Sequence, residues 1–170
     1  MPTGPVVIGF DGTAPAERAL RESAALLAPR PALVVVVWET GRAFDLLTLP
    51  IRTLEVPVSL DVRAAIEAEK AAYESAERLA EQGAALASEL GYQAEGLAVA
   101  DEMSVADTLL RVAAEHDSPA LVVGSHGRRG LAAALLGSTS KAVVERASCP
   151  VMVVRSETRR TDTQQSDTGQ

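Results

Sequence analysis

Apolar residues are distributed along this chain in two alternating patterns. Short segments rich in Val, Leu and Ala are typical of strands buried in a parallel sheet, and they occupy residues 5–10, 32–38, 92–100, 120–123 and 150–155. Between them, apolar residues form one stripe in residues 14–28 and another in residues 61–90, which predicts two amphipathic helices. Two further helices are predicted at residues 104–115 and 139–147. The chain is therefore expected to alternate between strands and helices.

This alternation predicts the architecture. Parallel strands that are separated by helices are joined by right-handed crossovers, so the helices cover both faces of the sheet. We predict a single open, doubly wound sheet of five parallel strands, an α/β fold of the Rossmann-like kind. The length of 170 residues favours one domain, to which we assign residues 1–155. Residues 156–170 contain no Leu, Ile, Val, Phe, Tyr or Trp, and we predict a disordered polar tail.

Charge and composition narrow the possible partners. The formal net charge is -7, which argues against nucleic acid as a partner, because phosphate backbones are bound by clustered Lys and Arg. The N-terminus has no basic region before an apolar core, and no apolar run approaches the ~20 residues that span a bilayer. We therefore expect a cytoplasmic protein with no membrane partner. The single cysteine, Cys149, excludes an intrachain disulfide and is expected to serve in packing.

The segment after the fourth predicted strand carries the strongest signal for chemistry. Glycines let the backbone approach a ligand, and the N-terminus of the helix that follows attracts anions through its N–H groups and its dipole. Hydroxyl groups at the start of that helix can donate further bonds, and no acidic residue between 124 and 139 would repel a phosphate. The candidate phosphate-binding residues are Gly124, Gly127, Arg128, Gly137, Ser138 and Thr139.

Other interpretations of these glycines remain open at this point. A pair of glycines three residues apart can simply turn the chain. The segment is not a Walker A loop, because Gly-Lys-Ser/Thr is missing, and it lacks the GxGxxG fingerprint of dinucleotide-binding folds. Asp11, in the turn after the first predicted strand, can likewise serve only to cap that turn or the first helix.

Two stretches resemble a known family. The segment from Val122 to Arg155 is similar to the end of a universal stress protein domain. The ATP-binding members of that family carry a glycine, two residues, a glycine, nine residues, a glycine and then Ser or Thr. The four matching positions in this chain are Gly124, Gly127, Gly137 and Ser138. The start of the chain, VVIGFDGTAPAERAL, resembles the first strand and turn of that family, with Thr13 where Ser is usual. The resemblance covers residues 5–155.

The resemblance implies a ligand and a role for each site residue. Strands one and four would be neighbours, so that the loop carrying Asp11 faces residues 124–138, which we call the glycine loop. Asp11 would bind the adenine or ribose, and Val37 would offer backbone bonds to the adenine. The glycines 124 and 127 would lie along the ribose and phosphates, and residues 137–139 would close on the outer phosphates with Mg²⁺. The expected ligand is ATP, or else ADP or AMP, with no metal ligand assigned to the protein.

The resulting expectation is an ATP-binding universal stress protein that acts as a nucleotide-dependent sensor or regulator. A protein partner would respond to the bound state, and the family resemblance implies a homodimer that forms through the last strand. Two alternatives remain: a slow ATPase or nucleotidyl-transfer enzyme on a related fold, and a dimeric interaction module with a vestigial site. Within residues 124–139, His126 is the only titratable candidate for a catalytic base, so at most slow ATP hydrolysis is expected.

Overall fold

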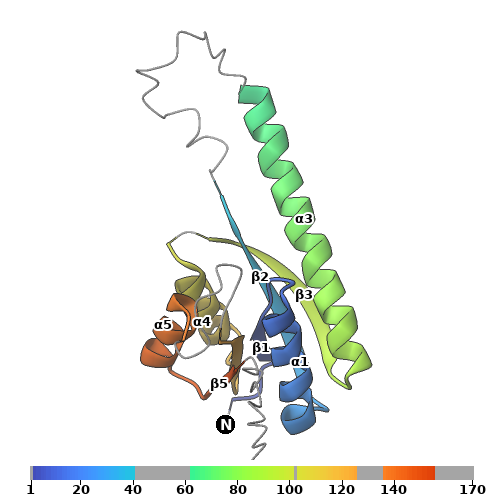
Figure 1. Cartoon of the computed structure of the whole chain (residues 1–170), viewed down its shortest axis with the longest axis vertical. Helices are drawn as coiled ribbons and strands as arrows, with labels where there is room; N and C mark the ends of the chain where they lie inside the picture. Colours follow the sequence, from blue (N-terminus) through green and yellow to red (C-terminus); the bar gives the residue numbers. More distant parts are fainter. Residues whose placement is uncertain (1, 41–61, 102, 126–135, 156–170) are drawn as a thin grey trace, which may run out of the picture.

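A computed structural model describes residues 2–40, 62–101, 103–125 and 136–155. These residues form one sheet in which all paired strands are parallel, with the strand order β3-β2-β1-β4-β5 (Figure 1). The predicted five-stranded α/β fold is therefore confirmed. The elements are β1 (Val6–Gly9), α1 (Ala14–Leu27), β2 (Pro31–Glu39), α3 (Val62–Glu89), β3 (Gln93–Asp101), α4 (Val105–Glu115), β4 (Leu121–Gly124), α5 (Ser138–Arg146) and β5 (Val151–Val154).

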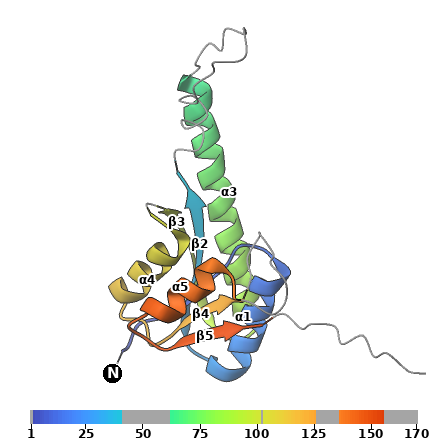
Figure 2. The same cartoon turned by 60° about the vertical axis from the view of Figure 1, so that its left-hand side comes forward.

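Of the helices in the described residues, two cover each face of the sheet, as the doubly wound prediction requires. Alternate side chains of a strand point to opposite faces, so Val6 and Ile8 join the core beneath α1 and α3, whereas Val7 joins the core beneath α4 and α5. Figure 2 shows α4 and α5 together on one side of the sheet. Both cores are mainly aliphatic, and each strand of the interior is buried on both faces, which explains its continuous apolar sequence.

The observed ends of the elements differ from the predicted ends by at most one residue. The last helix begins at Ser138 rather than Thr139, and the last strand begins at Val151 rather than Pro150. The carbonyl of Pro150 still accepts a hydrogen bond from the N–H of Leu121, at 2.9 Å. Proline has no N–H to donate, so it precedes the strand without extending its ladder.

Close packing of α3 on the sheet depends on residues without large side chains. A Cβ atom on Gly96 of β3 would lie 2.6 Å from the carbonyl carbon and oxygen of Ala80 in α3. On the helix side, a Cβ on Gly83 would lie 2.8 Å from side-chain atoms of Phe10 and Val34. The backbone of α3 therefore rests almost directly on β3, while Figure 1 shows its N-terminal end extending beyond the strands.

The start of α4 is tied to the end of α5 by a carboxylate. Ser104 is the N-cap of α4, and its hydroxyl accepts a hydrogen bond from the N–H of Asp107 at 3.1 Å, which is one half of a capping box. The carboxylate of Asp107 accepts hydrogen bonds from the Ser104 hydroxyl and from the Arg146 guanidinium. Together, the hydrogen bond from Ser104 and the contact with Arg146 lower the pKa of Asp107.

We expect this contact to make stability depend on pH. Because the pKa of Asp107 is lower in the folded chain than its unfolded value of about 3.9, its contribution is fully present above that value. The contribution is lost as the pH falls through the folded pKa. Asp107→Asn should therefore lower the free energy of unfolding at pH 7, and the difference from wild type should shrink below about pH 4. Urea denaturation across this range measures it, and a difference that stays constant to pH 2 would contradict the assignment.

Candidate functional site

The strand order places a topological switch point between β1 and β4. These two strands are neighbours, with Val7 opposite Leu121 and Ile8 opposite Val122, as the resemblance implied. β1 leads into α1 on one face of the sheet, and β4 precedes α5 on the other face. Chains that leave neighbouring parallel strands toward opposite faces separate at the carboxyl edge, which is where ligands bind in open α/β sheets.

The N-terminus of α5 is held against the end of β4 by two hydrogen bonds. The N–H of Gly137 donates to the carbonyl of Ser125 at 2.8 Å, and the hydroxyl of Ser140 donates to the carbonyl of Gly124 at 2.7 Å. The N–H of Ser125 in turn donates to the carbonyl of Val154 at 2.8 Å. Residues that are well separated in sequence are thus brought to one point at the switch.

The first turn of α5 has the electrostatic character of an anion site. The N-cap is Gly137, which has no side chain to accept a bond from the first N–H groups of the helix. The first turn contains no acidic residue. Ser138 and Thr139 are the first two helical residues, so their N–H groups have no acceptor within the helix. The positive end of the helix dipole therefore points into the region where the three predicted residues Gly137, Ser138 and Thr139 come together.

A second helix N-terminus meets the same strand end. A Cβ atom on Gly124 would lie 3.1 Å from the carbonyl oxygen of Pro15 and 3.2 Å from its carbonyl carbon. Pro15 belongs to the first turn of α1, so the missing side chain at Gly124 lets that turn pack onto the end of β4. Gly124 thus has a packing role, in addition to any approach of a ligand, and the N-termini of α1 and α5 converge on it from opposite faces.

Asp11 adopts the turn geometry that was left open as an alternative. Its Oδ1 accepts hydrogen bonds from the N–H of Thr13 at 3.1 Å and from the Thr13 hydroxyl at 2.6 Å. Gly12 between them has a φ of 75°, in the left-handed region that favours glycine. Thr13 is the N-cap of α1 but makes no side-chain capping bond. The half-buried carboxylate of Asp11 therefore holds the turn at the carboxyl end of β1.

Val37 lies on β2 beyond the end of its neighbour β1. The last register pair between the two strands is Gly9 with Val35, whereas β2 continues to Glu39 and pairs there with β3. The side chain of Val37 packs against the core beneath α4. The backbone of Val37 therefore lies beside the carboxyl end of β1, at the same end of the strands as Asp11. Three predicted residues, His126, Gly127 and Arg128, lie outside the described residues.

Two serines at this edge were not identified from the sequence. Ser125 and Ser140 are both buried, with 2% and 3% of their surface exposed, and both take part in the bonds that join β4 to α5. The available signal was the position of Ser140, three residues before the buried Val143 and so on the apolar face of its helix. A buried hydroxyl requires a partner, and here the partner comes from the end of β4.

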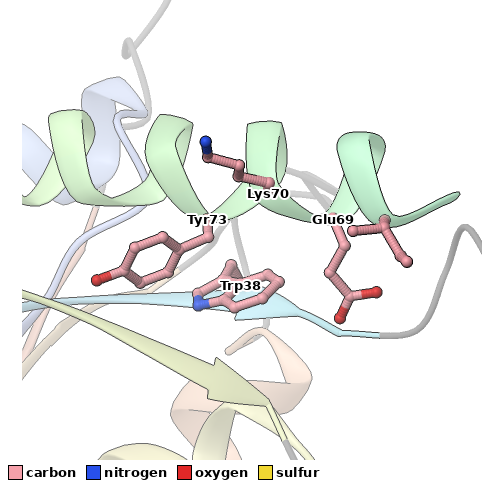
Figure 3. A pocket seen from close by; sticks show the side chains of 5 residues that line it. Trp38, Glu69, Lys70 and Tyr73 are labelled. Atoms are coloured by element: carbon pink, nitrogen blue, oxygen red, sulfur yellow. The ribbon is translucent and has the colours of Figure 1, made fainter. Parts of the chain in front are cut away.

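A separate pocket of about 270 Å³ lies between β2 and the N-terminal half of α3 (Figure 3). The rings of Trp38 and Tyr73 meet edge to face across it, with centroids 5.8 Å apart. Its lining residues are Trp38, Ile66, Glu69, Lys70 and Tyr73. None of them is a predicted site residue, and the pocket opens on the α3 face rather than at the α5 N-terminus.

Other candidate features are limited. Among the residues that the structure describes, no three His, Cys, Asp or Glu side chains gather into a group that could hold a metal ion. No helix within the described ranges is long and apolar enough to cross a membrane. Cys149 is half-buried, and burial raises the pKa of its thiol, which accords with a packing role rather than a reactive thiolate.

Several solved structures share the fold over nearly the whole chain. Their sequence identities to this chain are low, so the likeness concerns the fold alone. A hypothetical protein designated MJ0577 superposes with a TM-score of 0.71 at 18% identity, over 93% of this chain and 99% of that one. A universal stress protein from Archaeoglobus fulgidus in complex with dAMP has a TM-score of 0.53 at 23% identity, over 91% and 100%. A universal stress protein in complex with cAMP has a TM-score of 0.56 at 22% identity, over 91% and 98%.

A sequence-level comparison is more specific. No curated protein sequence matches the chain. The model of the universal stress protein family, however, matches residues 3–155, which include every element of the sheet and all the predicted site residues. By this match, the chain belongs to the universal stress protein family.

Proposed function

We propose that this protein binds ATP at the switch point between β1 and β4 and acts as a nucleotide-dependent sensor or regulator. The observation that carries the proposal is the convergence of two helix N-termini on Gly124, with the α5 terminus tied to β4 through Gly137 and Ser140. The spacing of Gly124, Gly127, Gly137 and Ser138, which matches the ATP-binding members of the family, supports it independently.

The charges around the two helix N-termini suggest how the nucleotide is oriented. The α1 side carries the carboxylate of Asp11 and has Glu17 in its first turn, whereas the first turn of α5 has no acidic residue. Phosphates are therefore favoured at α5, near Ser138 and Thr139, and the uncharged adenine and ribose at β1 and β2, near Asp11 and the backbone of Val37. The complexes of two related structures with dAMP and cAMP support an adenine nucleotide as the ligand.

The glycine loop supplies the remaining groups in this proposal. Gly124 and Gly127 lie along the ribose and phosphates, and Arg128 adds positive charge. Mg²⁺ accompanies the outer phosphates, which supply its main ligands, and the hydroxyls of Ser138 and Thr139 lie at the same helix terminus. We assign a sensing role rather than catalysis because the segment from 124 to 139 contains no Asp, Glu or Gln to orient a water for attack.

Calorimetric titration of the full chain with ATP and Mg²⁺ tests the proposal. The expected dissociation constant is in the micromolar range, which corresponds to a binding free energy of about -8 kcal/mol. Mass spectrometry of the small molecules released when the purified protein is denatured identifies the nucleotide carried from the cell. The proposal fails if the folded protein shows no binding of ATP, ADP or AMP and carries no nucleotide on purification.

We also propose that two copies pair through β5, as the resemblance implies. Among the strands described, β5 is at one edge of the sheet. The carbonyls of Pro150 and Val154 accept hydrogen bonds from the β4 side, so by the alternation of a strand the N–H groups of Val151 and Val153 face the open edge. An unpaired apolar edge of this kind favours pairing with another chain.

A proline at position 153 tests this interface. Val153→Pro removes an outward N–H group and should convert a dimer into monomers, because proline cannot donate to a new ladder. Val153→Ala loses similar packing but keeps the N–H, so it should remain dimeric. Light scattering at tens of micromolar protein measures the mass of each. A monomeric wild type, or a proline variant that stays dimeric, would rule out this edge as the interface.

A further inference from the structure

Ser140 occupies an unusual position for a helical serine. It is the third residue of α5, only 3% of its surface is exposed, and its hydroxyl donates to the carbonyl of Gly124 at 2.7 Å rather than to its own helix. Serines in helices commonly bond to a carbonyl of the preceding turn. Ser23 in α1 does so, since its hydroxyl donates to the carbonyl of Leu20 at 3.0 Å.

The bond from Ser140 determines where the positive end of α5 lies relative to the sheet. Gly124 is the last residue of β4, and the next carbonyl, that of Ser125, accepts from the N–H of Gly137 at 2.8 Å. One bond ties the N-cap and the other ties the third helical residue, so together they restrain both the position and the tilt of the first turn. Losing the bond from Ser140 would leave the N-cap held but the turn free to rotate about it.

We propose that Ser140 is a positioning residue for the phosphate half of the nucleotide site. The inference rests on the proposed nucleotide function and goes beyond it, because Ser140 is not among the residues assigned to touch the ligand. The N–H groups of Ser138 and Thr139 act on phosphate only when the helix points at it, since hydrogen bonds weaken steeply with misalignment. The base is assigned to β1 and β2, which the Ser140 bond does not touch, so its influence should fall on the phosphates rather than on the base.

Binding of ATP and of adenosine to the full chain tests the proposal. In Ser140→Ala, the dissociation constant for ATP should rise about tenfold, as expected when a misaligned first turn loses one hydrogen bond to phosphate, while that for adenosine changes less than about twofold. Calorimetry measures ATP, and NMR titration measures the weaker adenosine. Ser140→Thr keeps the hydroxyl and should restore the wild-type ratio of the two affinities.

Ser23→Ala is the matched control. It removes an equally buried serine hydroxyl that also donates to a backbone carbonyl, but it lies in the C-terminal half of α1, away from the carboxyl ends of the strands. Thermal denaturation of both variants separates stability from binding. A merely structural role would lower the melting temperature of Ser140→Ala while leaving the ATP-to-adenosine ratio as in Ser23→Ala, and that result would overturn the inference. A wild-type protein that binds neither ATP nor adenosine would overturn the proposed function, and the inference with it.

Discussion

Replacing Gly137 with aspartate is expected to abolish ATP binding and to leave the domain at least as stable as the wild type. Gly137 is the N-cap of α5 with φ -61° and ψ 159°, a conformation that any residue adopts. Aspartate is a favourable N-cap, because its carboxylate accepts bonds from the first N–H groups of the helix and interacts well with the dipole. In the proposed complex the same N–H groups bind phosphate. The new carboxylate would therefore compete for them and repel the ligand.

The size of this repulsion makes the experiment decisive. Two unit charges about 4 Å apart interact by about 4 kcal/mol at an effective dielectric constant near 20, which corresponds to a loss of more than a hundredfold in affinity. Gly137→Asn is the matched control, because asparagine caps the helix in the same way without charge. Calorimetry should show that the asparagine variant binds ATP far more tightly than the aspartate variant, while urea denaturation shows both to be folded. Equal ATP affinity in the two variants would place the phosphates elsewhere.

The second large effect concerns the fold. Gly96→Ala should destabilise the domain by about 3 kcal/mol, at the upper end of the cost of overpacking and a large part of a typical domain's stability. The added Cβ would lie 2.6 Å from the carbonyl carbon and oxygen of Ala80 and 2.9 Å from the nitrogen of Glu81. These are backbone atoms in the C-terminal half of α3, so relief requires the helix to move away from β3 rather than one side chain to rotate.

Urea denaturation followed by circular dichroism measures this change. Glu95→Ala is the control on the same strand, because Glu95 is exposed and its truncation should alter the free energy of unfolding by less than about 0.5 kcal/mol. ATP affinity should survive in Gly96→Ala at temperatures where the variant is folded, because β3 lies at the opposite edge of the sheet from β5 and away from α5. A Gly96→Ala variant as stable as Glu95→Ala would show that α3 packs less closely than the structure indicates.

The order and type of the elements could be predicted from local patterns alone. Strands buried on both faces need continuous apolar segments, and helices with one buried face need spacings of three and four, so each segment carries its own signal. The cap that Ser104 provides for the N–H of Asp107 was predictable for the same reason, because its partners are three residues apart. The neighbouring of β1 and β4 was implied by the family resemblance, and the strand pairing confirms it.

Local patterns also located the phosphate-binding candidates but not the reasons for them. The glycines and hydroxyls at 124, 137, 138 and 139 were identified by their place between a strand and a helix, and the structure brings these four together at one strand end. The assignment of Asp11 and Val37 to a ligand came only from resemblance, and it remains a prediction. What the structure adds for Asp11 is the pair of bonds with Thr13 that holds its turn.

Only the tertiary structure could decide the contacts between segments that are distant in the chain. Gly124 lacks a side chain because the first turn of α1 packs onto it, and Ser140 is buried because its hydroxyl reaches the end of β4. Gly96 is required because the backbone of α3 lies against it. In each case the contacting group comes from a helix or strand that is distant in sequence and is brought there by the packing of helices on the sheet. The residues adjacent in sequence therefore do not identify it. The sequence thus determined the elements and where to look for a site, and the packing determined which residues hold that site in place.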